Sequence, residues 1–162
     1  MPEYIDLPID RDELMMLAQI AERERDAFFE RNPHLIPLYR DRFLAAALCQ
    51  GAALQFIGRG YGVKDFDIHF FYLKNPVKPR LSRAVKRLWS DVGKFKNVQI
   101  DFIRTLVPVC VENSSSKSEV EIIERFLVET PTSNARHLSQ KAVVGLVPED
   151  LLGAIIWPQQ RA

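Results

Sequence analysis

The sequence predicts an α/β (α+β) fold, in which helices flank a small mixed β-sheet. Strand-like and helix-like segments alternate through the second half of the chain, a pattern typical of such layered folds. The chain has 162 residues, of which 47% are hydrophobic and 27% charged, enough apolar material for one core. We therefore expect a single domain over 1–162, with a core at about 36–107. A helical and short-strand extension would occupy 108–162.

The first third of the chain predicts helices. Apolar residues recur at helical spacing over 10–31, Asp10 or Asp12 can cap the start, and Asn32 precedes a proline that ends the pattern. A second helix is predicted over 38–57, because its later half, FLAAALCQGAALQFI, is apolar nearly all round and suits the core. Gly51 interrupts this segment and indicates a break or a close approach.

The middle of the chain predicts two strands. After a glycine-rich turn at 58–62, the aromatic segment FDIHFFYL (66–73) has strand character, and VQIDFIRTLV lies in a second strand over 97–107. Between them, 81–90 predicts a basic helix with Trp89 toward the core. An amphipathic helix at 118–129, a further helical segment that could include a strand, and a short final strand at 154–157 complete the order.

Three aspartates lie in the two predicted strands. Asp65 and Asp67 are two residues apart and therefore point to one face, while Asp101 stands between apolar neighbours in the second strand. If the strands pair, the three carboxylates converge. Such a cluster suits Mg²⁺, which prefers oxygen ligands, and it would be self-repelling without a cation. The alternative is that these are solvated surface aspartates that bind no ion.

These residues resemble a known family. Gln50-Gly51-Ala52-Ala53-Leu54 and Lys64-Asp65-Phe66-Asp67-Ile68 are similar to the motifs of the nucleotidyltransferase superfamily, which has a DNA polymerase β-like fold. The small "minimal" and the toxin or antitoxin-type bacterial nucleotidyltransferases are the most similar members. The resemblance covers roughly 43–104.

The resemblance implies Mg²⁺-dependent transfer of a nucleotidyl group from an NTP to a macromolecular acceptor, tRNA or protein. One or two Mg²⁺ ions would be held by Asp65, Asp67 and Asp101, and Asp101 would also act as the base for the acceptor hydroxyl. Gly51 would let the backbone approach the NTP phosphates. The family has two small residues in a row, whereas this chain has Gln50 at the first position, so a catalytically inactive nucleotide- or RNA-binding module, or a protein-partner module, is the alternative. Arg59 and Lys64, in and after the glycine turn, would compensate as phosphate contacts, and the alternative is that both are solvated loop charges.

The charge distribution adds one candidate surface. The net charge is only +1, yet lysine and arginine gather between 74 and 96, where they either bind a nucleic acid or form a solvated face. The two cysteines, Cys49 and Cys110, lie in apolar runs and are expected to be buried and reduced. We expect a cytoplasmic protein without a leader or a membrane span. The basic candidates are Lys78, Arg80, Arg83, Lys86 and Arg87.

Overall fold

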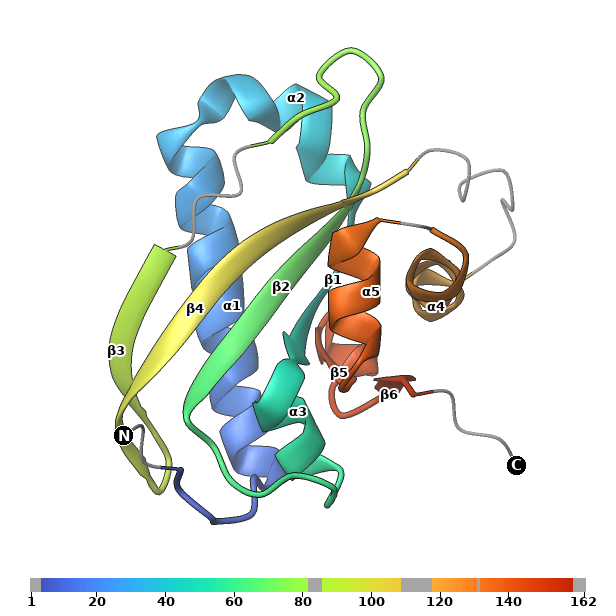
Figure 1. Cartoon of the computed structure of the whole chain (residues 1–162). Helices are drawn as coiled ribbons and strands as arrows, with labels where there is room; N and C mark the ends of the chain where they lie inside the picture. Colours follow the sequence, from blue (N-terminus) through green and yellow to red (C-terminus); the bar gives the residue numbers. More distant parts are fainter. Residues whose placement is uncertain (1–3, 82–85, 109–117, 131, 159–162) are drawn as a thin grey trace.

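A computed structural model describes residues 4–81, 86–108, 118–130 and 132–158. In this part of the chain six strands form one mixed sheet in the order β3-β4-β2-β1-β5-β6 (Figure 1). β2 and β4 are parallel, and the other neighbours are antiparallel. The predicted α/β class is therefore confirmed. The strands are β1 (Phe43–Cys49), β2 (Asp65–Leu73), β3 (Lys86–Val92), β4 (Phe95–Val107), β5 (Val143–Val147) and β6 (Ile155–Trp157).

Helices cover both faces of the sheet (Figure 1). α1 packs on one face, where residues such as Phe66 and Ile68 of β2 join the larger hydrophobic core. α4 and α5 pack on the other face against alternate residues such as Phe71. The helices are α1 (Arg11–Arg31), α2 (Ile36–Tyr39), α3 (Gln50–Phe56), α4 (Glu119–Glu129) and α5 (Ser133–Ser139), with short 3₁₀ helices η1 (Pro33–Leu35), η2 (Arg40–Arg42) and η4 (Glu149–Leu151).

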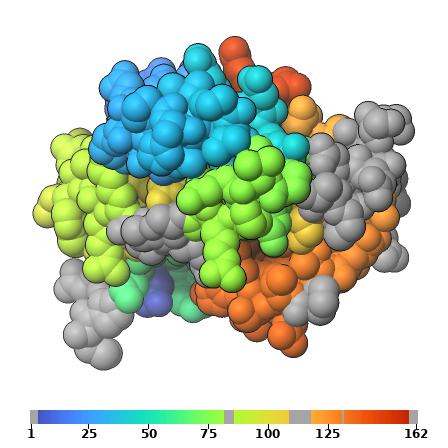
Figure 2. Space-filling model, turned by 90° about the horizontal axis from the view of Figure 1, so that it is seen from above, coloured from blue at the N-terminus to red at the C-terminus, as the bar shows by residue number. Residues whose placement is uncertain are grey.

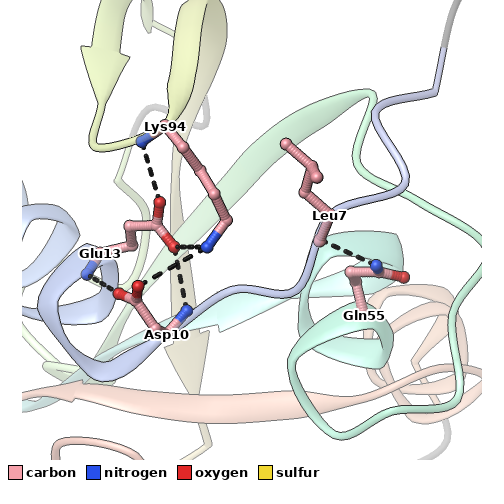
Figure 3. A network of polar contacts seen from close by, with 5 residues as sticks. All are labelled: Leu7, Asp10, Glu13, Gln55 and Lys94. Atoms are coloured by element: carbon pink, nitrogen blue, oxygen red, sulfur yellow. Dashed lines mark hydrogen bonds and ion pairs between the residues drawn. The ribbon is translucent and has the colours of Figure 1, made fainter.

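The first helix matches its prediction. Asp10 is the N-cap of α1 and forms a reciprocal capping box with Glu13. Glu13 is 3% exposed and also accepts hydrogen bonds from the backbone and Nζ nitrogens of Lys94, at 3.0 and 2.9 Å (Figure 3). This network ties the start of α1 to the turn between β3 and β4.

The helix predicted over 38–57 is wrong in its central part, because 43–49 forms strand β1. β1 lies between β2 and β5, and from Ala45 to Cys49 it is almost fully buried. A strand covered on both faces has no polar alternation, so its sequence looks like that of a buried helix. The chain changes from strand to helix at Gln50, whose φ is 64°.

The basic helix predicted over 81–90 is also wrong for its described part, since 86–92 forms the edge strand β3. Gly93, with φ 57°, lies in a tight turn that pairs β3 with β4 as a hairpin. Trp89 does not point to the core as predicted and is 60% exposed. Of the basic stretch, Lys86 and Arg87 are on β3, and Lys78 and Arg80 are exposed in the loop before it. Arg83 lies outside the described residues.

The remaining elements confirm the sequence predictions with small shifts in their ends. β2, β4, α4 and β6 lie where strands and helices were expected, and the segment after 133 contains both a helix and the strand β5. Cys49 is buried and free, while Cys110 lies outside the described residues. Within the described residues we find no helix that is long and apolar enough to cross a membrane.

Two loops are fixed by specific contacts. Gln55 on α3 donates to the carbonyl of Leu7 (Figure 3). Gln55 also accepts from the backbone nitrogen of Gly62, and so it joins the N-terminal segment to the glycine-rich turn. A Cβ at Gly60 would lie 2.7 Å from the backbone of Gln55, so the turn requires glycine there. The loop over 74–81 lies beside the α2 region, where Asn75 donates to the carbonyl of Leu38 (Figure 2).

Candidate metal and nucleotide site

Strand register brings the three aspartates together. In the parallel pair of β2 and β4, Asp67 lies opposite Asp101 and Asp65 lies opposite Gln99, so these side chains share one face. Each of the three aspartates offers one carboxylate oxygen within 4.8 Å of the others. Phe66 and Ile68 point to the opposite face and are fully buried in the core. The predicted convergence of the carboxylates is thus confirmed, and ion binding stays a prediction.

Asp101 has further polar partners on its own side of the site. Arg87 of β3 lies with its Nε 3.3 Å from Oδ1 of Asp101. The side-chain amide of Gln99 donates to both carboxylate oxygens at 3.0 Å. Asp101 is 8% exposed, whereas Asp65 and Asp67 are half-buried. One carboxylate is therefore paired with a cation of the protein, and the other two lie against each other.

The electrostatics of the site disfavour the charged forms of the two β2 aspartates. Burial, followed by repulsion from Asp65 and Asp101, raises the pKa of Asp67 from 3.8 to about 7. Burial and then the charge of Asp101 raise the pKa of Asp65, opposed by the nearby cations Lys64, Arg87 and Lys141. A divalent cation among the carboxylates would reverse this repulsion, and an all-oxygen donor set fits Mg²⁺.

A cavity of about 240 Å³ lies beside the aspartates. Asp65 and Asp67 form one wall, and the start of α3, the glycine-rich turn and α5 with the turn after it form the others. A Cβ built on Gly51 meets no atom within 4 Å, so this backbone faces open space. The backbone at Gly51 is therefore open to a ligand in the cavity. The other lining residues are Tyr4, Gln50, Ala52, Leu54, Gly60, Tyr61, Gly62, Lys64, His137 and Lys141.

Gln50 is the unusual residue of this cavity. It is only 9% exposed, it lines the cavity, and its φ of 64° is one that non-glycine residues rarely adopt. Its side-chain nitrogen Nε2 is fully buried and has no hydrogen-bond partner among the described residues. A buried amide donor without a partner costs free energy, so the fold holds Gln50 in this position at a cost.

The other predicted nucleotide contacts divide between the cavity and the surface. Lys64 lines the cavity, as predicted for a phosphate contact. Arg59 is exposed on the turn and is not among the lining residues, so its proposed role gains no support from the cavity. His69, which shares the face of Asp67, is buried and hydrogen-bonds Thr105 through Nδ1 at 3.1 Å. It is therefore a packed structural histidine.

Four lining side chains are not among the predicted site residues. Tyr4 and Tyr61 form an edge-to-face pair with ring centroids 5.2 Å apart, and Tyr61 is 70% exposed at the cavity mouth. His137, on α5, lines the cavity together with Lys141, the cation that follows that helix. Tyr61 belongs to the glycine-rich turn just before Asp65. Sequence spacing could not place Tyr4, His137 and Lys141 near 65–67, because they come from segments distant in the chain.

Comparisons with protein-family models, with curated proteins and with solved structures found no match to this chain.

Proposed function

We propose that this protein transfers a nucleotidyl group from an NTP to a hydroxyl of a macromolecular acceptor, with Mg²⁺ as cofactor. The observation that carries the proposal is the carboxylate cluster of Asp65, Asp67 and Asp101, whose oxygens lie within 4.8 Å of one another, with Asp65 and Asp67 at the wall of a cavity. Three carboxylates together suit a divalent cation, and a cation beside a cavity suits a phosphate ligand.

The residues around the cavity would have different roles in binding and catalysis. Asp65, Asp67 and Asp101 would hold Mg²⁺, which when bound neutralises charge that develops on the transferring phosphoryl group. The Nε2 of Gln50 and the open backbone at Gly51 would contact phosphate oxygens, and Lys64 and Lys141 would contribute positive charge. The buried donor of Gln50 would thereby gain the partner that it lacks.

The reaction would be an in-line displacement. The acceptor hydroxyl would form a bond to the α-phosphorus of the NTP, the bond between that phosphorus and the bridging oxygen would break, and pyrophosphate would leave. Asp101 would accept the hydroxyl proton, since it lies on the side of the cluster away from the cavity.

The test is incubation with each radiolabelled NTP, Mg²⁺ and either total tRNA or lysate protein. We expect label to be transferred to one acceptor class by the wild type. The double variant Asp65→Ala with Asp67→Ala should lose transfer, and Asp41→Asn, an exposed aspartate outside the site, should retain it. Transfer that is equal in the wild type and the double variant would exclude this site.

A second candidate function is binding without catalysis. Asp101 is already paired with Arg87 and Gln99, so part of the cluster is satisfied without a metal ion. A nucleotide- or RNA-binding module, or a module that binds a partner protein, would not require a metal ion at these carboxylates. Retained NTP binding without label transfer would favour this candidate.

A further inference from the structure

The sheet face that carries the aspartates continues past them onto the edge strand β3. In the register of β3 and β4, Arg87 lies opposite Asp101 and Trp89 lies opposite Gln99. Two rows of side chains therefore cross the sheet on one face. One row is Trp89, Gln99 and Asp65, and the other is Arg87, Asp101 and Asp67.

Trp89 is exposed in an unusual position. Tryptophan is largely buried in most proteins, yet Trp89 is 60% exposed on the face that carries the carboxylates. Neighbouring strands are about 4.8 Å apart, so Trp89 lies about 10 Å across the sheet from Asp65. The indole is therefore one strand beyond Asp101, on the side opposite the cavity.

The residues around Trp89 indicate which class of ligand fits this surface. Arg87 lies on the same face two residues earlier, with its side chain 66% exposed. An exposed aromatic ring beside an exposed guanidinium is the pair that binds single-stranded nucleic acid, through base stacking and phosphate contact. The charged side chains of Lys86, Arg87 and Asp91 on this edge strand disfavour pairing with a second sheet edge.

We propose that the acceptor is a single-stranded nucleic acid, which stacks a base on Trp89 and contacts Arg87 through a phosphate. This inference rests on the proposed function, because it places the acceptor hydroxyl on the Asp101 side of the carboxylates and the NTP in the cavity on the other side. When a base stacks on Trp89, its ribose lies within about 10 Å of the carboxylates, which is the spacing across two strands.

The chain offers a clean spectroscopic test, since it contains two tryptophans, Trp89 and Trp157. The Nε1 of Trp157 donates to the carbonyl of Ser139 at 2.7 Å, on α5. In the variant Trp157→Phe, Trp89 is the sole indole. We expect a short single-stranded RNA to quench the fluorescence of this variant and to leave that of Trp89→Phe almost unchanged.

Affinity provides the second readout. RNA binding, measured by anisotropy of a labelled oligonucleotide, should weaken about 5- to 150-fold in Trp89→Ala, because a stacked base contributes about that factor. NTP binding should be unchanged in Trp89→Ala. The exposed position of Trp89 makes a folding defect unexpected, and circular dichroism of the variant checks this.

The failures of the two proposals are distinguishable. RNA that binds Trp89→Ala as tightly as the wild type, or that leaves the Trp157→Phe fluorescence unchanged, overturns the inference. A Trp89 fluorescence that changes with protein concentration in the absence of RNA also overturns it, because this would indicate that a second copy of the chain contacts Trp89. Label transfer to protein alone overturns it as well. Quenching by RNA in a protein that transfers no label would overturn the proposed function and retain the nucleic-acid surface.

Discussion

Asp67→Asn should make the metal-free protein more stable at neutral pH. The pKa of Asp67 is raised to about 7, chiefly by burial and then by repulsion from Asp65 and Asp101. The folded state therefore holds the proton more tightly than the unfolded chain, in which the pKa of this carboxyl group is 3.8. The penalty for ionisation is absent below about pH 4 and fully developed above about pH 7, so the free energy of unfolding falls as the pH rises through this window.

The size of the effect follows from the pKa. A rise from 3.8 to about 7 corresponds to about 4 kcal/mol. Asp67 is only partly buried, so relaxation and solvent screening reduce this to about 2 kcal/mol. In a chain of this length, 1 kcal/mol changes Tm by about 2–4 °C. The asparagine variant should thus gain about 4–8 °C at pH 7.5 and less than half of that at pH 5.

Thermal unfolding followed by circular dichroism in EDTA measures this directly. Asp41→Asn, an exposed aspartate elsewhere, serves as the control and should leave Tm unchanged at both pH values. Added Mg²⁺ should raise the Tm of the wild type and not that of Asp67→Asn. A lower Tm for Asp67→Asn at pH 7.5, or the same gain at pH 5 and pH 7.5, would refute the reasoning.

Three further predictions concern other positions. Gln50→Met removes the unpartnered buried donor, so its free energy of unfolding in urea should be about 1–3 kcal/mol higher than that of the wild type. The variant should also bind NTP more weakly in calorimetry, and tighter binding would contradict the role of Gln50. Gly51→Ala should fold with about 1 kcal/mol more stability, because its Cβ meets no protein atom, and should lose NTP affinity; unchanged affinity would remove the phosphates from this backbone. Glu13→Ala should lower the free energy of unfolding in urea by about 2–4 kcal/mol, because it leaves the backbone nitrogens of Asp10 and Lys94 without the carboxylate that accepts from them. Its NTP affinity at low temperature should equal that of the wild type.

The carboxylate cluster was predictable because period-2 alternation fixes which strand residues share a face. Asp65 and Asp67 had to point together, and Asp101 needed only a parallel neighbour in the matching register. Local sequence carries that information. The start of α1 was predictable for the same reason, since its capping box is contained within four residues.

What the sequence could not supply depends on partners distant in the chain. β1 is apolar on both faces because strands lie on both sides of it and helices above and below, and such a strand has the pattern of a buried helix. The exposure of Trp89 follows from β3 being an edge strand, which no local pattern reveals. The unpartnered amide of Gln50 is a property of packing, which the sequence does not reveal. We propose Gln50 as a phosphate contact although it departs from the nucleotidyltransferase motif that this segment resembles.

The central claim is that Asp65, Asp67 and Asp101 share a divalent cation. Mn²⁺ prefers the same oxygen ligands as Mg²⁺ and scatters X-rays anomalously, so the decisive measurement is an anomalous difference map from crystals grown with Mn²⁺. We predict a peak about 2 Å from oxygens of all three carboxylates, with Arg87 withdrawn from Asp101. A map without a peak at these carboxylates, in which Arg87 remains on Asp101, would contradict the claim.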